Sequence, residues 1–182
     1  SAERDDFRGE YNPAPFYSTK PRQVDGASTF STEAPPQYHS GFNGSALTGF
    51  SPPDPSMAVG PSDLVSTVNC NLTVRDKDGT FISSVALTTM LGSSQFIFDP
   101  HIRYDIHRNR FVGVAVGHDG APNRQNARWW IFYSNDSTGE GTWSGFAMNA
   151  RFNGATDDEV WVDYPHIGYT NDAIAVTGIA FN

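Results

Sequence analysis

An acidic segment near residue 160 holds the side chains best suited to acid–base chemistry. In TDDEVWVDYPH, four carboxylates lie close together in sequence: Asp157, Asp158, Glu159 and Asp163. Two carboxyl groups can serve as the acid and the base of glycoside hydrolysis, so this segment is the default candidate for a hydrolytic site. A solvated acidic loop is the simpler interpretation, and it is favoured.

Three aspartates recur before proline and offer a second kind of chemistry. Asp54 and Asp99 stand in Asp-Pro, and Asp163 stands in Asp-Tyr-Pro. Carboxylates ligate calcium, so all three are candidate calcium ligands. Hydrogen bonding to turn amides is the favoured role, because aspartate readily accepts nearby backbone N–H groups. The stretch DKDG at 76–79 begins like a calcium-binding loop, but Leu87 replaces the glutamate needed at the twelfth position, so a hairpin turn is predicted.

Two tryptophans and two histidines could also be functional. Trp129 and Trp130 are adjacent, so on a strand they point to opposite faces. One ring is predicted to pack between sheets, and the other is a candidate for stacking on a sugar, as in lectins. His101 and His166 follow two of the prolines at matched positions, which favours a repeated structural role over zinc binding. The single cysteine, Cys70, permits no internal disulfide and lies in no nucleophile motif.

Three glycosylation sequons bear on the compartment. Asn-x-Ser/Thr occurs at Asn43, Asn71 and Asn135, where chance would give roughly one match. Coincidence remains an alternative, but a secreted eukaryotic glycoprotein is the favoured interpretation, because Asn43 and Asn135 stand in loop-like sequence. The expected location is therefore extracellular or on the cell surface.

Charge and hydropathy exclude several classes of partner. The formal net charge is −8, which disfavours nucleic acid and anionic membranes. No apolar run approaches the ~20 residues that a membrane-spanning helix needs, so membrane insertion is not expected. The chain has 17 glycines and 12 prolines and no long helical periodicity, which favours strands and turns.

The chain divides near residue 53. Residues 1–53 hold seven of the 12 prolines and scattered aromatics, without strand or helix periodicity. Because proline blocks helix interiors and central strands, an extended arm is predicted. Its aromatic side chains indicate that it lies against a surface, either of its own domain or of a neighbouring chain.

Residues 54–182 carry a repeat that predicts the architecture. Repeats start near residues 54, 99 and 163, and each runs from the aspartate and proline through a short polar turn into an apolar stretch. The strands at 64–68, 111–117 and 173–181 are predicted to be innermost, and hairpins fill the intervals. Propeller blades repeat every 40–50 residues or so. The predicted fold is therefore all-β, with antiparallel four-stranded propeller-type blades forming an incomplete propeller behind an N-terminal arm.

Residues 45–182 resemble the opening blades of secreted, sialidase-like β-propellers. The resemblance lies in four phrases: SPPDPSMAVGPSDLVSTVNCNLTVRDKDGT, FDPHIRYDIHRNRFVGVAV, YSNDSTGEGTW and DYPHIGYTNDAIAVTGIAFN. It implies a secreted or cell-surface protein, often beside adhesive modules, generally without an assigned activity. Family propellers continue for several further blades. Sialidases also use an arginine cluster, whereas Arg103, Arg108 and Arg110 lie in one repeat here, which disfavours catalysis.

Two functional classes are expected. The first is a non-catalytic extracellular structural or adhesive glycoprotein that assembles into a filament through its arm and open sheet edges. Its partners would be other copies of itself or a C-terminal portion of a longer chain. The second is a carbohydrate-active propeller, either a glycoside hydrolase or a lectin. A weaker alternative is a fragment or scaffold domain of a larger secreted protein.

Overall fold

The computed structural model describes residues 41–46, 48–120, 126–153, 156–157 and 160–181. Residues 40–182 form one compact unit, and residues 1–39 form a separate one. The predictions for the arm up to residue 40 lie outside the described residues. No strand is present between residues 41 and 55 in the described part of this stretch.

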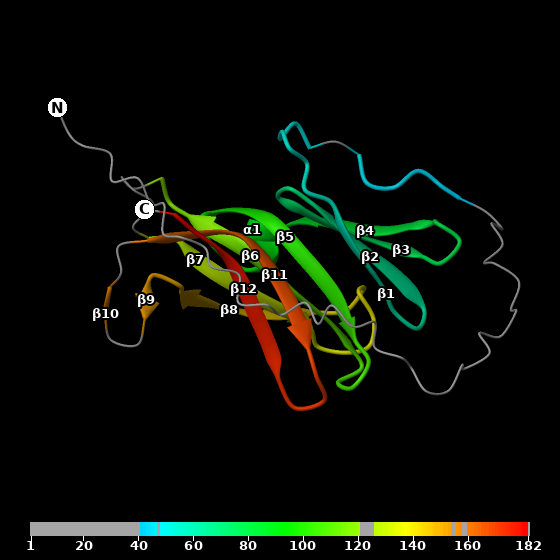
Figure 1. The fold of residues 1–182 in the computed structure, drawn as a ribbon. Coiled ribbons are helices and arrows are strands. Elements are labelled where there is room, and N and C mark those ends of the chain that lie inside the picture. Colours follow the sequence, from blue (N-terminus) through cyan, green and yellow to red (C-terminus); the bar gives the residue numbers. More distant parts are fainter. Residues whose placement is uncertain (1–40, 47, 121–125, 154–155, 158–159, 182) are drawn as a thin grey trace, which may run out of the picture. The chain divides into compact units, whose positions relative to one another are not determined.

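The regular secondary structure of the described chain is almost all β-strand, as predicted (Figure 1). The first sheet has the order β1-β2-β3-β4, the second has the order β5-β6-β7-β8, and β11 pairs with β12 alone. All of these pairs are antiparallel. The elements are β1 (Ser56–Val59), β2 (Asp63–Val68), β3 (Asn71–Asp76), β4 (Phe81–Ala86), α1 (Leu87–Met90), β5 (Phe96–Asp105), β6 (Arg110–His118), β7 (Arg128–Ser134), β8 (Trp143–Asn149), β9 (Phe152–Asn153), β10 (Thr156–Asp157), β11 (Trp161–Tyr169) and β12 (Ile174–Phe181).

The DKDG stretch forms the predicted hairpin turn between β3 and β4. The carboxylate of Asp76 accepts the backbone N–H groups of Asp78 at 3.0 Å and Thr80 at 2.8 Å. Gly79 has φ +91°, a left-handed conformation that glycine adopts without steric cost. The sequence therefore encodes a tight reversal at this point.

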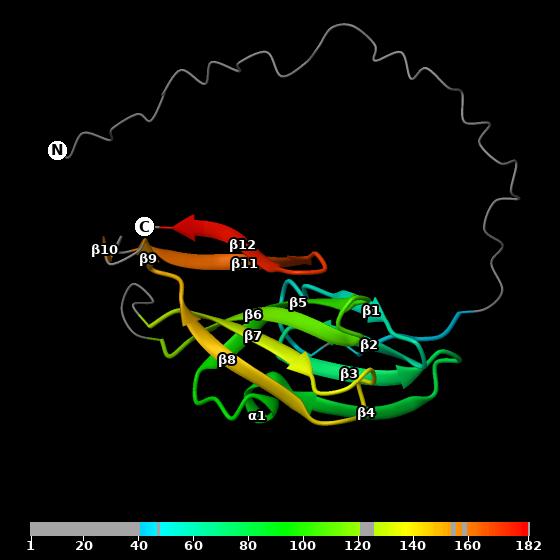
Figure 2. The same ribbon diagram turned by 90° about the horizontal axis from the view of Figure 1, so that it is seen from below.

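The β5–β8 sheet is the middle layer of the compact unit, with the β1–β4 sheet packed on one face and the β11–β12 hairpin on the other (Figure 2). On β6, Phe111 and Ala115 join the core shared with the first sheet. Val112 and Val114 join a second cluster with Ile167 of β11. Because successive strand residues point to opposite faces, a strand buried on both faces must be apolar along its buried length, as β6 is from Phe111 to Gly117.

The prediction of the innermost strands is wrong by one strand in each repeat. The predicted strands, at 64–68, 111–117 and 173–181, are β2, β6 and β12, which are the second strands of their sheets. The first strands, β1, β5 and β11, lie next to one another across the sheet boundaries. The proline phrases therefore lie within, or directly before, the strands that contact the neighbouring sheet.

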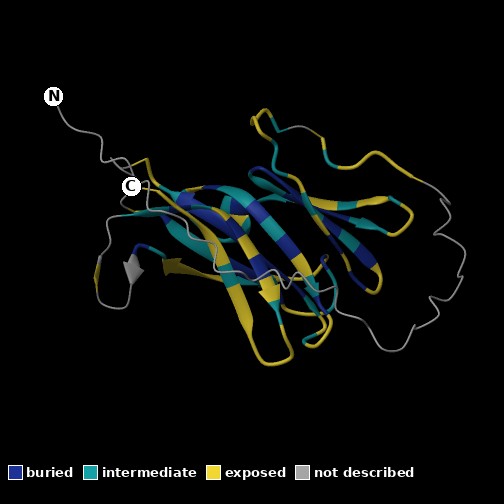
Figure 3. Ribbon diagram, in the orientation of Figure 1, coloured by how far each residue is buried: buried dark blue, intermediate teal, exposed yellow. Residues whose placement is uncertain are grey.

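The β11–β12 hairpin is covered on one face only. Val162 and Ile167 of β11 are buried, whereas every described residue of β12 except Val176 is exposed. In Figure 3 the contrast between β12 and the buried β6 is plain. Within the described part of the chain, β12 has one hydrogen-bonded neighbour, β11, so its other edge is open.

Candidate functional site: the junction of the three sheets

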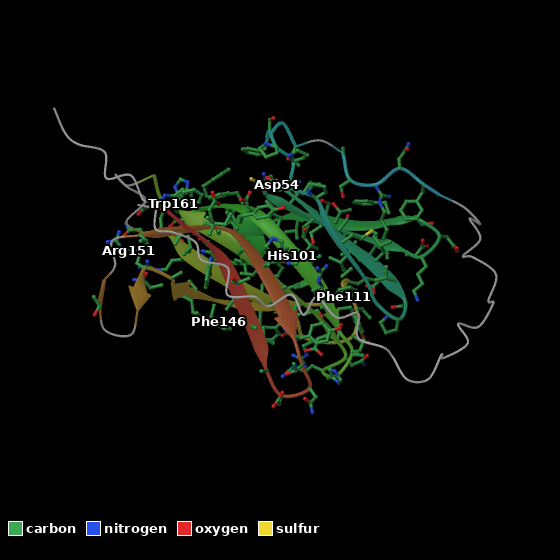
Figure 4. All side chains as sticks on the ribbon, viewed as in Figure 1. Asp54, His101, Phe111, Phe146, Arg151 and Trp161 are labelled. Carbon is green, nitrogen blue, oxygen red and sulfur yellow. The ribbon has the colours of Figure 1, made fainter. Side chains whose placement is uncertain are left out.

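The three proline phrases, far apart in sequence, converge on one small cavity. A pocket of about 120 Å³ is lined by the phrases Asp54-Pro55-Ser56, Asp99-Pro100-His101 and Tyr164-Pro165-His166. They come from β5, from β11, and from β1 together with the two residues that precede it. Figure 4 marks Asp54 and His101, which belong to the first and second of these phrases. The repeat recognised in the sequence is therefore a junction in space.

The third phrase is offset by one residue from the alignment on aspartates. The residues directly before the prolines have left-handed backbones, with φ of +42° at Asp54, +49° at Asp99 and +46° at Tyr164. Tyr164 thus occupies the place of the first two aspartates, and Asp163 precedes it. The carboxylate of Asp163 accepts the N–H of Tyr164 at 3.0 Å. The same strand irregularity occurs in both strands, between Phe98 and His101 in β5 and between Asp163 and His166 in β11, so Asp163 corresponds to Phe98.

The residue after each of the first two prolines joins its sheet to the next one. The Oγ of Ser56 accepts the backbone N–H of Ile102 at 3.1 Å, from the first sheet to the second. The Nδ1 of His101 accepts the backbone N–H of Ile167 at 3.1 Å, from the second sheet to the hairpin. Ser56 and His101 therefore perform the same task in successive repeats. This structural role for His101 agrees with the prediction from its matched position.

The carboxyl groups of the three predicted aspartates also meet. The carboxyl of Asp99 lies within hydrogen-bonding reach of those of Asp163 and Asp54. Burial first, and then these two neighbours, raise the pKa of Asp99 from an ordinary value of 3.8 to about 7. A proton held at Asp99 lets the three side chains approach, because two ionised carboxylates at this range repel each other.

Asn69 ties this cluster together, and no sequence motif marks it. Its Nδ2 donates to the carboxylate of Asp54 at 2.7 Å and to the carbonyl of Pro52 at 2.8 Å. Its Oδ1 accepts the backbone N–H of Asp99 at 2.7 Å. The side chain is buried, so one amide group positions the first residues of two repeats.

The described part of the chain contains no group of three or more histidine, cysteine, aspartate or glutamate side chains placed to hold a metal ion. The calcium assignment to Asp54, Asp99 and Asp163 therefore stays a prediction without a coordination geometry to support it.

Beside the cluster, burial and then the charge of Asp99 raise the pKa of the Cys70 thiol. A thiol held protonated in this way is a poor nucleophile.

His101 titrates in the opposite direction from Asp99. Burial first, and then Arg103 and His166, lower the pKa of His101 from 6.5 to about 4. The neutral ring is the form that accepts the hydrogen bond from Ile167. The stability due to neutral His101 is therefore present above pH 6.5 and is lost as the pH falls toward 4.

The Asp99→Asn variant separates these two titrations. Because the pKa of Asp99 is raised, the contribution of Asp99 to the free energy of unfolding falls as the pH rises from about 4 to about 7 and then levels off. Asparagine does not titrate, so the variant lacks the pH-dependent contribution of Asp99 and keeps that of His101. We expect the variant to gain about 1–2 kcal/mol relative to wild type between pH 4 and pH 8, after allowance for solvent screening at this partly exposed site. Urea unfolding at several pH values measures the difference, and a difference independent of pH would contradict the shared proton.

Both predicted tryptophans are partly covered by packing. Trp129 packs against the cluster between the second sheet and the hairpin, which agrees with a ring placed between sheets. Trp130 packs against the core shared with the first sheet, and its Nε1–H donates to the Oε1 of Gln95 at 3.0 Å. Sugar stacking by either ring stays a prediction, because no described feature tests it.

The sequons occupy three different settings. Asn43 is exposed and lies outside the strands, Asn71 is partly exposed at the start of β3, and Asn135 is exposed in the turn between β7 and β8. The Nδ2 of Asn135 donates to the Oγ1 of Thr142 at 2.8 Å. The glycan prediction stays open at all three positions.

The acidic residues considered for hydrolysis lie mostly outside the described part of the chain, and the arginines make separate contacts. Asp158 and Glu159 lie outside the described residues, and Asp157 is described only as backbone in β10. Arg108 donates to Asp105 at 2.7 Å and to the carbonyl of Thr170 at 3.0 Å. Arg110 lies over the ring of Tyr133, and Arg103 lines a groove between β5 and β11. Arg108 and Arg110 are thus engaged in structural contacts.

Comparisons with protein-family models, with curated proteins and with solved structures found no match to this chain. Among the described residues, no helix has the length and apolar character needed to cross a membrane.

Proposed function

We propose that this chain is a non-catalytic extracellular structural or adhesive glycoprotein that assembles through uncovered sheet surfaces and its N-terminal arm. The observation that carries the proposal is the repeated junction. Three sheets are joined by one recurring contact, and the last of them, the β11–β12 hairpin, has an open edge and an exposed outer face. Uncovered strands of this kind pair or pack with other chains.

The repeat also supports the finer architecture of a partial β-propeller. Each sheet begins with a strand that carries the proline phrase, and these first strands are neighbours. Propellers place the first strands of successive blades around a common axis. In this proposal the small pocket between the phrases lies on that axis, and the three sheets are successive blades.

The extracellular location rests on the three sequons and on the secreted family that the sequence resembles. Intact-mass measurement of native protein before and after treatment with an amide-cleaving glycosidase tests it. A mass decrease at one or more of Asn43, Asn71 and Asn135 is expected. An unchanged mass would remove the main support for a eukaryotic secretory origin.

Self-assembly is tested by sedimentation of the full chain over a range of concentrations, together with electron microscopy. We expect concentration-dependent association, with filaments at high concentration, and weaker association after removal of residues 1–39. A circular dichroism spectrum unchanged in the strand region controls for folding of the shortened chain. A full chain that stays monomeric and binds or cleaves oligosaccharides would instead support the carbohydrate-active alternative.

A further inference from the structure

We propose that copies of this chain join head to tail, with β1 of one copy packed on the outer face of the β11–β12 hairpin of another. The junction uses the contact that already links the three sheets inside one copy. This inference rests on the self-assembly proposed above, and it names the two surfaces responsible.

The internal contact occurs twice with the same chemistry. At each step, the residue after the proline accepts a backbone N–H from the first strand of the following repeat: Ser56 from Ile102, and His101 from Ile167, each at 3.1 Å. Ile102 also packs into the core shared with the first sheet, and Ile167 packs into the cluster shared with the second. One backbone hydrogen bond and one buried side chain thus define each step.

One half of a third contact is exposed on β1. Met57 follows Ser56 as Ile102 follows His101 and Ile167 follows His166, so the three hold the same place. Ile102 is 0% exposed and Ile167 is 4% exposed, because a preceding sheet covers each of them, whereas Met57 is 55% exposed. Val59, two residues further along β1, is 52% exposed.

The other half is exposed on the hairpin. His166 holds the position of Ser56 and His101, and within the described part of the chain it makes ring contacts with His101 and Tyr164 but no hydrogen bond. Its acceptor is thus free for a further backbone N–H. Because His166 is equivalent to Ser56 and His101, and Met57 is equivalent to Ile102 and Ile167, His166 would accept the backbone N–H of Met57 from another copy.

The apolar surface around the His166 acceptor is likewise exposed where its equivalent in the second sheet is buried. Ile102 pairs with Gly113, and Ile167 pairs with Val176, so Gly113 of β6 and Val176 of β12 hold equivalent positions. Three residues further along each strand, Ile179 of β12 is therefore equivalent to Val116 of β6. Val116 is 0% exposed, whereas Ile179 is 52% exposed. Thr177 of β12, which pairs with His166, lies on the same face as Ile179 and is also exposed.

The partner that fits is a second copy, because every copy carries both uncovered halves of one contact. The interface continues an arrangement that the chain already makes twice. Because the two surfaces differ, the junction is heterologous and propagates into a ring or an open filament. Burial of the exposed apolar side chains at both surfaces supplies the driving force.

Two charge substitutions in the full-length chain test this junction. Met57→Glu blocks the β1 surface, and Ile179→Glu blocks the hairpin surface; both side chains are more than half exposed in the single copy, so the fold tolerates the change. We expect each variant alone to associate at least about tenfold more weakly than wild type in sedimentation equilibrium, since a buried charge opposes the contact. Phe146→Glu on β8, where the side chain is 51% exposed and lies on neither surface, is the matched control and retains wild-type association.

The mixture of the two variants gives the sharpest readout. Met57→Glu keeps its hairpin surface and Ile179→Glu keeps its β1 surface, so an equimolar mixture forms heterodimers and nothing larger. Two variants that fail separately but associate together must both be folded. Absence of the heterodimer overturns head-to-tail pairing.

The remaining outcomes separate this inference from the proposed function. Wild-type association that both variants retain, but that removal of residues 1–39 abolishes, overturns the junction and leaves assembly through the arm. A wild-type chain that is monomeric at its highest soluble concentration overturns both proposals. Coverage of these surfaces by another segment of a longer chain, or by a different protein, would give that monomeric result.

Discussion

Replacing Phe111 with alanine is expected to lower the free energy of unfolding by about 3–5 kcal/mol, as for other fully buried aromatic side chains. Phe111 is 0% exposed, lies in the core between the first two sheets and has its ring 4.8 Å from that of Tyr104. Its backbone N–H donates to the Oγ of Ser134, and alanine keeps this bond. The loss therefore reports packing between the sheets.

Phe146 is the matched control for this experiment (Figure 4). It lies on β8 and is 51% exposed, so Phe146→Ala is expected to cost less than about 1 kcal/mol. Urea unfolding followed by tryptophan fluorescence measures both variants. Equal losses would mean that the first two sheets do not share the core described here.

The second large effect is expected at Asn69. Asn69→Ala removes three hydrogen bonds of 2.7–2.8 Å and leaves the carbonyl of Pro52, the carboxylate of Asp54 and the N–H of Asp99 without this partner. Unsatisfied groups at partly buried positions each cost about 1 kcal/mol or more, so we expect a loss of about 2–4 kcal/mol in the free energy of unfolding.

Two further variants test whether the loss in the free energy of unfolding comes from the hydrogen bonds of Asn69. Asn126→Ala removes an exposed hydrogen bond to Asp119 and is expected to cost less than about 0.5 kcal/mol. Asn69→Asp keeps an acceptor for the N–H of Asp99 but adds a carboxylate to the cluster, so its destabilisation should grow as the pH rises. A cost for Asn69→Ala no larger than that of Asn126→Ala would show that Asn69 does not organise the junction.

The junction accounts for the unusual phrase that the sequence repeats. Proline after a left-handed residue sets the backbone direction at the start of each repeat. The next side chain then accepts a hydrogen bond from the following sheet. Serine and histidine both serve because the step requires one acceptor atom, and the surrounding packing supplies the rest of the energy.

Local features of the sequence were sufficient to predict the strands and hairpins. The Asp-Gly turn after β3 and the polar turn between β7 and β8 were readable, because turn residues and alternation act over a few neighbouring positions. The proline phrases were also readable in the sequence, and the structure brings them together at one cavity, with the third phrase offset by one residue. Each of these signals is encoded within a short stretch of chain, so no distant contact was needed to find it.

The tertiary structure decided which strands meet and which side chains share a site. The joining strands are β1, β5 and β11 and not the more apolar second strands, because the junction depends on hydrogen bonds between sheets as well as on burial. The register of β11 placed Tyr164, and not Asp163, at the position that Asp54 and Asp99 hold directly before proline. Asn69 joins groups 15 to 30 residues away in sequence, and Asp99 meets Asp54 and Asp163 from still farther away. Such long-range contacts leave no local pattern in the sequence.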